Sequence, residues 1–459
     1  MTAKSDYVKI IPVSGAEAVI EHVQPPLFSD DWLALDFASR AELLRWSPGL
    51  EWMAYDGVVW RRDDLLKRFD LARQICRDAA SEASEEDAKR LASSRTVNAV
   101  VSLARSDPRI IVPAEAWDQE PMWLNCPAGL IDLRTGAIRT REGEYVTQKA
   151  RVSPENAPAP VWLRFLNEVF CGDADLIEFM RRALGYGLTG DRREQVLFFW
   201  YGSGANGKSV LAEFIQWLMD GYSIKLPAAT LMQSRGERHP TELAQLRGKR
   251  LAVSSELDES SCFNESLVKE LTGDTTLTAR FMRADFFEFA MTQKHIIIGN
   301  FQPRLRGGDP AIARRMLLVP FMASFKGSAR DPQMLNKLKA EAPAILHWII
   351  RGSIAWSEDG LAVPSTVRDA SADYLAEHDD LTLWIDECCV REDEERASLL
   401  YESFSRWKKA RGEHATSQTT WGSRLASAPG IQKRKSGGVI YQGLSLAKIE
   451  RERLQAVRF

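Results

Sequence analysis

Residues 202–209 read Gly-Ser-Gly-Ala-Asn-Gly-Lys-Ser, the G-x-x-x-x-G-K-[ST] spacing of a phosphate-binding loop. Glycines let the backbone amides curl around a polyphosphate, and a helix that follows directs its positive end at the anion. Lys208 can reach the outer phosphates and the Ser209 hydroxyl can ligate Mg²⁺. The predicted nucleotide-binding residues are Gly202, Ser203, Gly204, Ala205, Asn206, Gly207, Lys208 and Ser209.

The segments on either side of this loop have the structure that it needs. Residues 196–201 are a continuous apolar run that suits a buried strand, and residues 209–219 repeat apolar side chains at helical spacing. The competing interpretation is a glycine-rich turn before an ordinary helix. Because strand, loop, Lys-Ser and helix occur together, we favour the nucleotide site.

Hydrolysis needs a carboxylate beside the metal and the attacking water, usually at the end of a neighbouring strand. Residues 250–256 form a short apolar run that ends in Glu256, which we predict to ligate the metal and activate water, with Asp258 and Glu259 as auxiliaries. A solvated surface acid is the alternative. The position downstream of a phosphate loop favours the catalytic interpretation.

Two further polar motifs follow apolar or helical segments. Residues 294–299 predict a third strand that ends in Asn300, which could contact the outer phosphate or orient the water, or could be a turn residue. Arg314 and Arg315 precede another apolar strand, and an arginine reaching the next subunit's nucleotide can stabilise the transition state. A surface salt bridge is the alternative, and the sequence does not choose between the two arginines.

Residues 271–290 contain two alternating apolar runs and predict a hairpin with Arg280 and Arg283 near its tip. Basic side chains at such a tip, repeated around a ring, would hold DNA phosphates without reading bases. A solvated hairpin is an equally good interpretation of the same residues.

The 459 residues carry a net charge of only -3, so a nucleic-acid surface must be local. The six cysteines include no C-x-x-C pair and the six histidines are scattered, which indicates neither a zinc site nor a disulfide framework. The N-terminus lacks a signal-peptide layout, and no apolar run reaches about 18 residues. We therefore expect a cytoplasmic protein with no membrane partner.

The order of the patterns predicts an α/β motor with a parallel central sheet, preceded by a mainly helical region and followed by a winged-helix-like tail. The tail ends in a hairpin that carries Lys433, Arg434 and Lys435, and we predict that these residues bind DNA. The predicted boundaries are 1–190 for the helical domain with small β units, 191–330 for the ATPase core, 331–365 for a helical connection and linker, and 366–459 for the tail.

These motifs resemble those of the superfamily III helicases, and more closely the primase-helicases of phages, satellite phages and plasmids. The likeness rests on residues 202–209, Ser255-Glu256, Asn300, and the run from Asp309 through Arg314-Arg315 to Phe321. It extends upstream through residues 129–136 and 184–190. The resemblance implies an AAA+-like motor that forms a hexameric ring on single-stranded DNA, with ATP bound between subunits.

Carried over by position, the resemblance makes Lys208 and Ser209 the ligands of phosphate and Mg²⁺, Glu256 the second-motif acid and Asn300 the sensor. By the same resemblance, Arg314 or Arg315 is the arginine finger that reaches the nucleotide of the next subunit. Arg283 is the residue at the hairpin tip that faces DNA. The chain departs from many relatives where Gly273-Asp274 replaces Gly-Gly-Asp. No zinc cluster or paired-carboxylate polymerase motif precedes the motor, so we expect the primase domain to be missing.

The sequence thus predicts an ATP-dependent replicative DNA helicase of a phage, prophage or mobile element, acting on single-stranded and forked DNA. It leaves open whether a separate primase is recruited. The alternative is a replication initiator that binds origin DNA and uses ATP mainly for assembly. The reason for this alternative is the basic tail, where one predicted helix carries Arg406, Lys408, Lys409 and Arg411. The competing interpretation is that this helix has a solvated basic face with no binding role. A stand-alone kinase is disfavoured, because it would have no use for the arginine pair and the hairpin.

Overall fold

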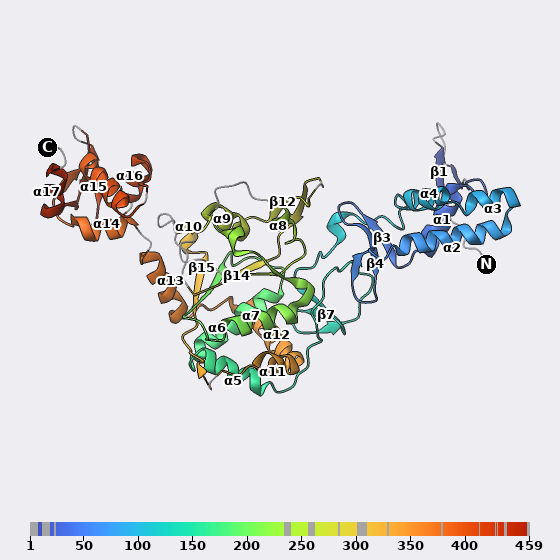
Figure 1. The fold of residues 1–459 in the computed structure, drawn as a ribbon, viewed down its shortest axis with the longest axis horizontal. Coiled ribbons are helices and arrows are strands. Elements are labelled where there is room, and N and C mark those ends of the chain that lie inside the picture. The colour runs from blue at the N-terminus through green and yellow to red at the C-terminus, as the bar shows by residue number, and fades with distance from the viewer. Residues whose placement is uncertain are drawn as a thin grey trace.

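The computed structural model is organised as three bodies that lie in a row in Figure 1. No helix among the described residues is long and apolar enough to cross a membrane. The structure describes residues 8–11, 19–22, 24–233, 240–255, 262–282, 285–300, 310–327, 330–377, 380–412, 414–426, 428, 430–435 and 438–456.

The N-terminal lobe packs helices against a three-stranded antiparallel sheet of order β3-β4-β5. These strands are rich in aromatic residues and bury Trp52 and Trp60, which are 7% and 6% exposed. The Asp56-Gly57 turn joins the last two strands, as the alternating pattern predicts. The elements are β1 (Val8–Ile11), β2 (Val19–His22), α1 (Asp30–Arg40), β3 (Leu44–Ser47), β4 (Glu51–Tyr55), β5 (Trp60–Arg62), α2 (Lys67–Glu82), α3 (Glu85–Leu91) and α4 (Ser94–Ala104).

The central body is built on a five-stranded sheet of order β10-β11-β14-β9-β15, in which every pairing is parallel. Its elements up to the end of the sheet are β6 (Trp123–Cys126), β7 (Gly129–Asp132), β8 (Ile138–Arg139), α5 (Pro160–Val169), α6 (Ala174–Leu188), β9 (Leu197–Tyr201), α7 (Lys208–Met219), β10 (Ser223–Lys225), α8 (Pro240–Ala244), β11 (Leu251–Ser254), α9 (Glu265–Gly273), β12 (Thr276–Ala279), β13 (Phe287–Ala290), β14 (Lys294–Gly299), α10 (Pro310–Ala313) and β15 (Met316–Pro320). The predicted α/β class with a parallel sheet after a helical region is confirmed.

Both faces of the sheet are covered, which explains why its strands are apolar throughout rather than alternating. On β9, Phe198 and Trp200 face a core shared with α5, α6 and α7, whereas Leu197 and Phe199 face a second core with α9. Because α5 and α6 share a core with β9, a domain boundary near residue 190 would divide one hydrophobic core. The helices before the loop, α5 and α6, are therefore part of the central body.

Three helices after the sheet also belong to this body: α11 (Met334–Ala340), α12 (Ala342–Asp359) and α13 (Ser365–Glu377). A Cβ on Gly352 of α12 would lie 2.0 Å from the Arg181 carbonyl of α6, so the two helices cross in direct backbone contact. The hydroxyl of Ser371 accepts from the Leu318 amide of β15 at 3.0 Å and caps the open edge of the sheet. Helix α13, which lies within the predicted tail at 366–459, thus packs on the central body.

The C-terminal lobe has its own core around Trp384, Phe404 and Trp421. A three-stranded sheet of order β17-β19-β18 flanks helices α15 and α16, which gives the helix, helix and hairpin arrangement that the sequence predicts. The elements are α14 (Asp380–Cys388), β16 (Cys389–Val390), β17 (Glu394–Arg396), α15 (Ala397–Ala410), α16 (Gln418–Ala426), β18 (Gln432–Lys435), β19 (Val439–Gln442), β20 (Ser445–Leu446) and α17 (Lys448–Ala456).

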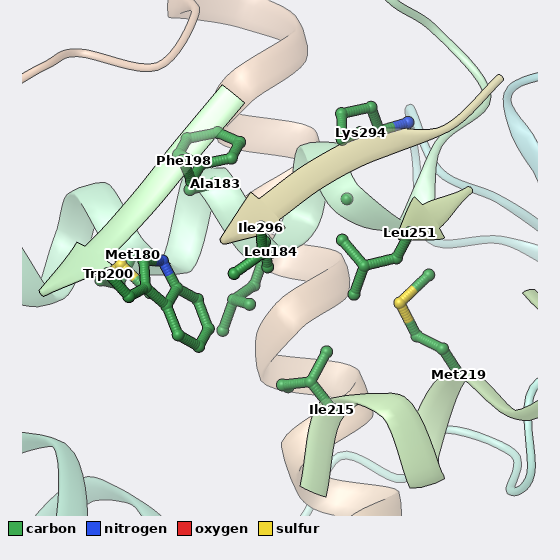
Figure 2. A pocket seen from close by; sticks show the side chains of 11 residues that line it. Met180, Ala183, Leu184, Phe198, Trp200, Ile215, Met219, Leu251, Lys294 and Ile296 are labelled. Carbon is green, nitrogen blue, oxygen red and sulfur yellow. The ribbon is translucent and has the colours of Figure 1, made fainter. Parts of the chain in front are cut away.

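Figure 2 shows a cavity beneath the sheet, lined by apolar side chains of β9, β14, α6 and α7. Its volume of about 10 Å³ is close to what one water needs, so it is a packing defect of the core and not a ligand site. Lys294 lies at its rim, and its ammonium donates to the carbonyl oxygens of Asp191 and Thr292 at 3.3 and 3.2 Å.

Candidate nucleotide-binding site

The loop between β9 and α7 adopts the backbone conformation that its glycines allow. Gly202, Gly204 and Gly207 have φ of 150°, 85° and 89°, and Ala205 between them has φ of 48°. Successive residues on the left-handed side turn backbone N–H groups into one concavity, which binds anions. The helix that follows begins at Lys208, so its free N–H groups face the same concavity.

Lys208 is the one charged residue in the loop of residues 202–209, and it is buried, with 2% of its surface exposed. Its ammonium donates to the Gly202 carbonyl at 2.8 Å, to Oδ1 of Asn206 at 3.0 Å and to Oδ1 of Asn300 at 3.4 Å. Burial disfavours the charged amine and lowers the pKa of Lys208 to about 8. An anionic phosphate in the concavity would supply the opposite charge that this ammonium needs.

The strand at the edge of the sheet holds the loop in place. Asn206 donates from Nδ2 to the carbonyl of Phe321 at 2.9 Å, and Phe325 donates its amide to the Ala205 carbonyl at 2.6 Å. A Cβ on Gly202 would lie 2.3 Å from that same Phe321 carbonyl. The segment after β15 thus braces the loop, a role that sequence reasoning missed because the two stretches are more than a hundred residues apart.

Helix α5 supports the loop from the other side. A Cβ on Gly207 would lie 2.6 Å from Cγ2 of Val169 and 3.5 Å from the ring of Phe165. Only glycine fits here, because the position combines a φ of 89° with this close approach. Their four-residue spacing puts Phe165 and Val169 on one face of the helix, but nothing in the sequence indicates the loop as their neighbour.

The strand order places the sensor candidate beside the loop. Because β14 pairs with β9, and Gly299 lies opposite Tyr201, Asn300 follows β14 at the edge where the loop follows β9. Ligands of open parallel sheets bind at the carboxyl ends of the strands. The structure thus brings Asn300 to Lys208. Ser254 ends the adjacent strand β11 at the same edge, whereas Glu256, Asp258 and Glu259 lie outside the described residues.

The residues at this edge fit a magnesium nucleotide. Ser209, the first residue after the lysine, is exposed at the start of α7, where its hydroxyl can ligate a cation held by phosphates. Ser203, also exposed, lies in the loop. When bound, Mg²⁺ would neutralise charge on the outer phosphates, and this chain's own part is the amide concavity with the Lys208 ammonium.

The two arginines lie at the opposite edge of the sheet. Met316 pairs with Leu197 and Pro320 with Tyr201, so Arg314 and Arg315 precede the strand at its amino end. Arg315 is 9% exposed and donates to the Ala311 carbonyl at 2.7 Å, whereas Arg314 is exposed. The structure separates the pair into one buried and one accessible side chain.

The hairpin of β12 and β13 pairs Thr276 with Ala290 and Ala279 with Phe287, as the alternating pattern predicts. Arg280 lies at its tip, with the guanidinium carbon 4.6 Å from the ring centroid of Phe286. Exposed apolar side chains surround it, namely Phe281 at 42%, Met282 at 73% and Phe286 at 59%. Arg283 lies outside the described residues. The predicted tip is therefore aromatic as well as basic.

The basic residues of the tail divide into two groups. Lys433, Arg434 and Lys435 are all exposed on β18. On α15, by contrast, the ammonium of Lys408 lies 3.0 Å from Asp380, and Arg411 lies 3.0 Å from Glu387. Strand β18 therefore presents a row of exposed basic side chains, whereas Lys408 and Arg411 lie beside acids of the same lobe.

Comparison with known families matches two consecutive regions of the chain. Residues 31–171 match the model described as "D5 N terminal like", and residues 200–315 match a family of unknown function, DUF5906. The second match spans the phosphate loop, Asn300 and the arginine pair. The chain belongs to the D5 primase-helicase family. The resemblance to superfamily III primase-helicases is thereby confirmed.

Relatives of this D5-family chain include viral proteins. It is 25% identical over 299 residues to "Putative helicase 022R" of Frog virus 3, covering 60% of this chain and 30% of that protein. It is 28% identical over 228 residues to "Putative helicase 184R" of Invertebrate iridescent virus 6, covering 47% and 23%. The chain spans less than a third of the length of these relatives. A solved structure of the NrS-1 C-terminal region aligns with TM-score 0.49 and 13% identity over 87% of this chain and 86% of that one.

Proposed function

We propose that this chain is an ATP-driven, AAA+-like DNA helicase of a virus, phage, prophage or mobile element, and that it works as a ring, hexameric by family resemblance. The observation that carries the proposal is that Lys208 and Arg314 lie at opposite ends of the parallel strands, separated by the length of a strand. The loop follows the carboxyl end of β9, whereas Arg314 precedes the amino end of β15.

A strand of five residues spans about 16 Å, so Arg314 lies far from the phosphates that its own loop would hold. Arg315 is tied to Ala311 and is buried. A transition-state arginine must contact the transferring phosphoryl group. Arg314 therefore serves a neighbouring subunit, in a head-to-tail interface that closes into a ring.

Subunit mixing tests the shared site. Lys208→Ala removes phosphate binding by the subunit's own loop. Arg314→Ala removes the arginine that contacts the nucleotide of the neighbouring subunit. Each variant alone is expected to lose ATPase activity. An equal mixture restores intact loop-and-arginine pairs at about one quarter of the interfaces of a random ring. A mixture that stays as inactive as its components, while still assembling, contradicts the shared site.

The hairpin supports DNA as the substance that the motor moves. Exposed aromatic rings at its tip can stack on bases without sequence preference, and Arg280 can contact phosphates. We assign Arg283 to the same surface on the strength of the sequence pattern. Forked-DNA unwinding by Arg280→Ala and Arg283→Ala is the measurement, and full unwinding by both variants at normal salt removes the hairpin from the DNA path.

The exposed basic strand β18 favours a second function, origin recognition by the C-terminal lobe. Lys433, Arg434 and Lys435 would contact phosphates beside a helix that reads the groove. Footprinting the full chain on its element's own DNA separates the two functions. Protection of one repeated site that Lys433→Gln/Lys435→Gln abolishes supports an initiator, and uniform salt-sensitive binding supports the helicase alone.

A further inference from the structure

A groove of about 390 Å³ lies in the N-terminal lobe between α2 and α4, far along the chain from the nucleotide site. Its lining is Phe69, Arg73, Cys76, Arg77, Ala92, Ser94, Val97 and Asn98. The four α2 residues follow helical spacing and so share one face of that helix, as do the three of α4. Figure 1 shows these two helices in the same lobe. The volume is in the range of sites for small ligands.

The floor and the rim of the groove differ in chemistry. Cys76 and Val97 are 1% and 8% exposed, and with the half-buried ring of Phe69 they form an apolar floor. Arg73 and Arg77 stand exposed on the rim. Burial raises the pKa of the Cys76 thiol to about 11, so the sulfur is neutral near pH 7 and suits an apolar floor.

The two rim arginines differ from other arginines of this lobe. Arg40 lies 2.8 Å from Asp78, Arg68 lies 3.0 Å from Asp63, and Arg109 lies 2.7 Å from Asp107. Arg73 and Arg77, in contrast, pair with no acid within the described ranges of the chain. Like charges four residues apart repel on a helix, so this arrangement gains from a bound anion.

The opposite wall adds polar groups that suit a nucleotide. Ser93 caps α4 by accepting from the Thr96 amide at 3.2 Å, so the helix begins at Ser94 on the groove wall. Asn98 donates from Nδ2 to the Ser94 carbonyl at 2.7 Å, which leaves its Oδ1 as an acceptor for a base edge. The groove therefore combines an apolar floor, a hydrogen-bonding amide and two guanidinium groups that pair with no acid in the part of the chain that the structure describes.

We propose that this groove binds single-stranded DNA, with a base on the Phe69 floor and successive phosphates on Arg73 and Arg77. The two arginines are four residues apart, about 6 Å along the helix axis, so they can contact two phosphates of a chain, whereas a mononucleotide offers only one. Planar guanidinium groups match phosphate oxygens in pairs. The proposal rests on the proposed function for its choice of DNA, but not on ATP turnover.

The test uses the full chain without nucleotide and a fluorescent dT20 oligonucleotide. Arg73→Gln/Arg77→Gln is expected to weaken binding about tenfold at moderate salt and to reduce the slope of log affinity against log salt by about 1.4, since each single-strand phosphate contact contributes about 0.7. The control Lys67→Gln/Arg105→Gln removes two exposed charges of the same lobe that do not line the groove. It is expected to keep near-original affinity.

Three results would overturn the proposal: unchanged affinity and salt slope in the groove variant, an equal loss in the control pair, or displacement of dT20 by dTMP at the same nucleotide concentration. The last would mark a site for free nucleotides. Photo-cross-linking of an oligonucleotide that carries 5-iododeoxyuridine adds a local readout, expected in peptides of α2 and α4. DNA-independent ATPase activity should be unaffected by the groove variant, which separates failure here from failure of the motor assignment.

Discussion

The ammonium of Lys208 lies 3.0 Å from Oδ1 of Asn206, and Nδ2 of the same Asn206 lies 2.9 Å from the Phe321 carbonyl. One buried amide therefore links the lysine of the loop to the end of β15, the strand whose other end follows Arg314. A shift of that strand would reach the lysine through two hydrogen bonds.

Asn206→Ala should weaken nucleotide binding and destabilise the fold. It leaves the buried Phe321 carbonyl without its donor and removes one acceptor of Lys208, and an unsatisfied buried polar group costs about 1–3 kcal/mol. KM for ATP and the thermal midpoint are the measurements. Ser203→Ala, an exposed change in the same loop, should leave stability unaltered. A wild-type midpoint and KM for Asn206→Ala would show that the amide link is dispensable.

Arg314→Ala and Arg315→Ala should fail in different ways. Arg315 is buried and bonded to Ala311, so its loss is expected to cost about 1–3 kcal/mol of unfolding free energy. Arg314 is exposed, so its loss should leave the melting temperature unchanged and abolish turnover. Denaturation curves beside ATPase rates separate the two. If Arg315→Ala melts normally and only Arg314→Ala is active, their roles are reversed.

Nucleotide affinity should fall at alkaline pH. The pKa of Lys208 is about 8 in the protein, so below that value the ammonium is already charged and binding takes up no proton. Above it, polyphosphate binding must restore the lost proton, and affinity is expected to drop by up to about tenfold per pH unit. Titration calorimetry with a non-hydrolysable ATP analogue between about pH 7 and 10 measures this affinity.

Lys208→Arg is the matched control, because a guanidinium stays charged throughout that range. Its affinity for the analogue, even if weaker overall, should vary little with pH. An equal alkaline decline in the arginine variant would assign the titration to another group.

Gly207→Ala should destabilise the motor by more than backbone strain alone. The new Cβ would lie 2.6 Å from Val169 at a φ of 89°, so helix α5 must move away from the loop. Gly360→Ala is the control, since it has φ of 72° but its nearest neighbour is at 3.6 Å. We expect about 1 kcal/mol for Gly360→Ala and about 2–4 kcal/mol for Gly207→Ala, by chemical denaturation. Equal losses of unfolding free energy in the two variants would mean that α5 can move away from the loop at little cost.

Local patterns were sufficient for the elements of the site. The glycines of residues 202–209 permit only a narrow set of backbone conformations, and a buried strand followed by helical spacing can be read within about 20 residues. The hairpin of β12 and β13 and the exposed β18 strand are local in the same sense, since antiparallel neighbours close in sequence need only alternation and a turn.

Long-range packing decided the rest. The order of strands, which puts β14 next to β9, determines that Asn300 meets Lys208. It also puts Arg314 at the far edge of the sheet and buries Arg315. Helix α13 was predicted to belong to the tail because its amphipathic pattern does not identify the surface that it covers, and the structure packs it on β15.

The sequence by itself therefore determined that this chain has the motif of a phosphate loop in an α/β fold, because that motif depends on backbone conformation and on residues that are adjacent. Only the tertiary structure decided which cations remain available. Lys408 is paired with Asp380, whereas Arg73 and Arg77 are unpaired among the described residues. The reason is physical: a charge is neutralised by whatever acid the fold brings near it, and residue type and spacing do not specify that neighbour.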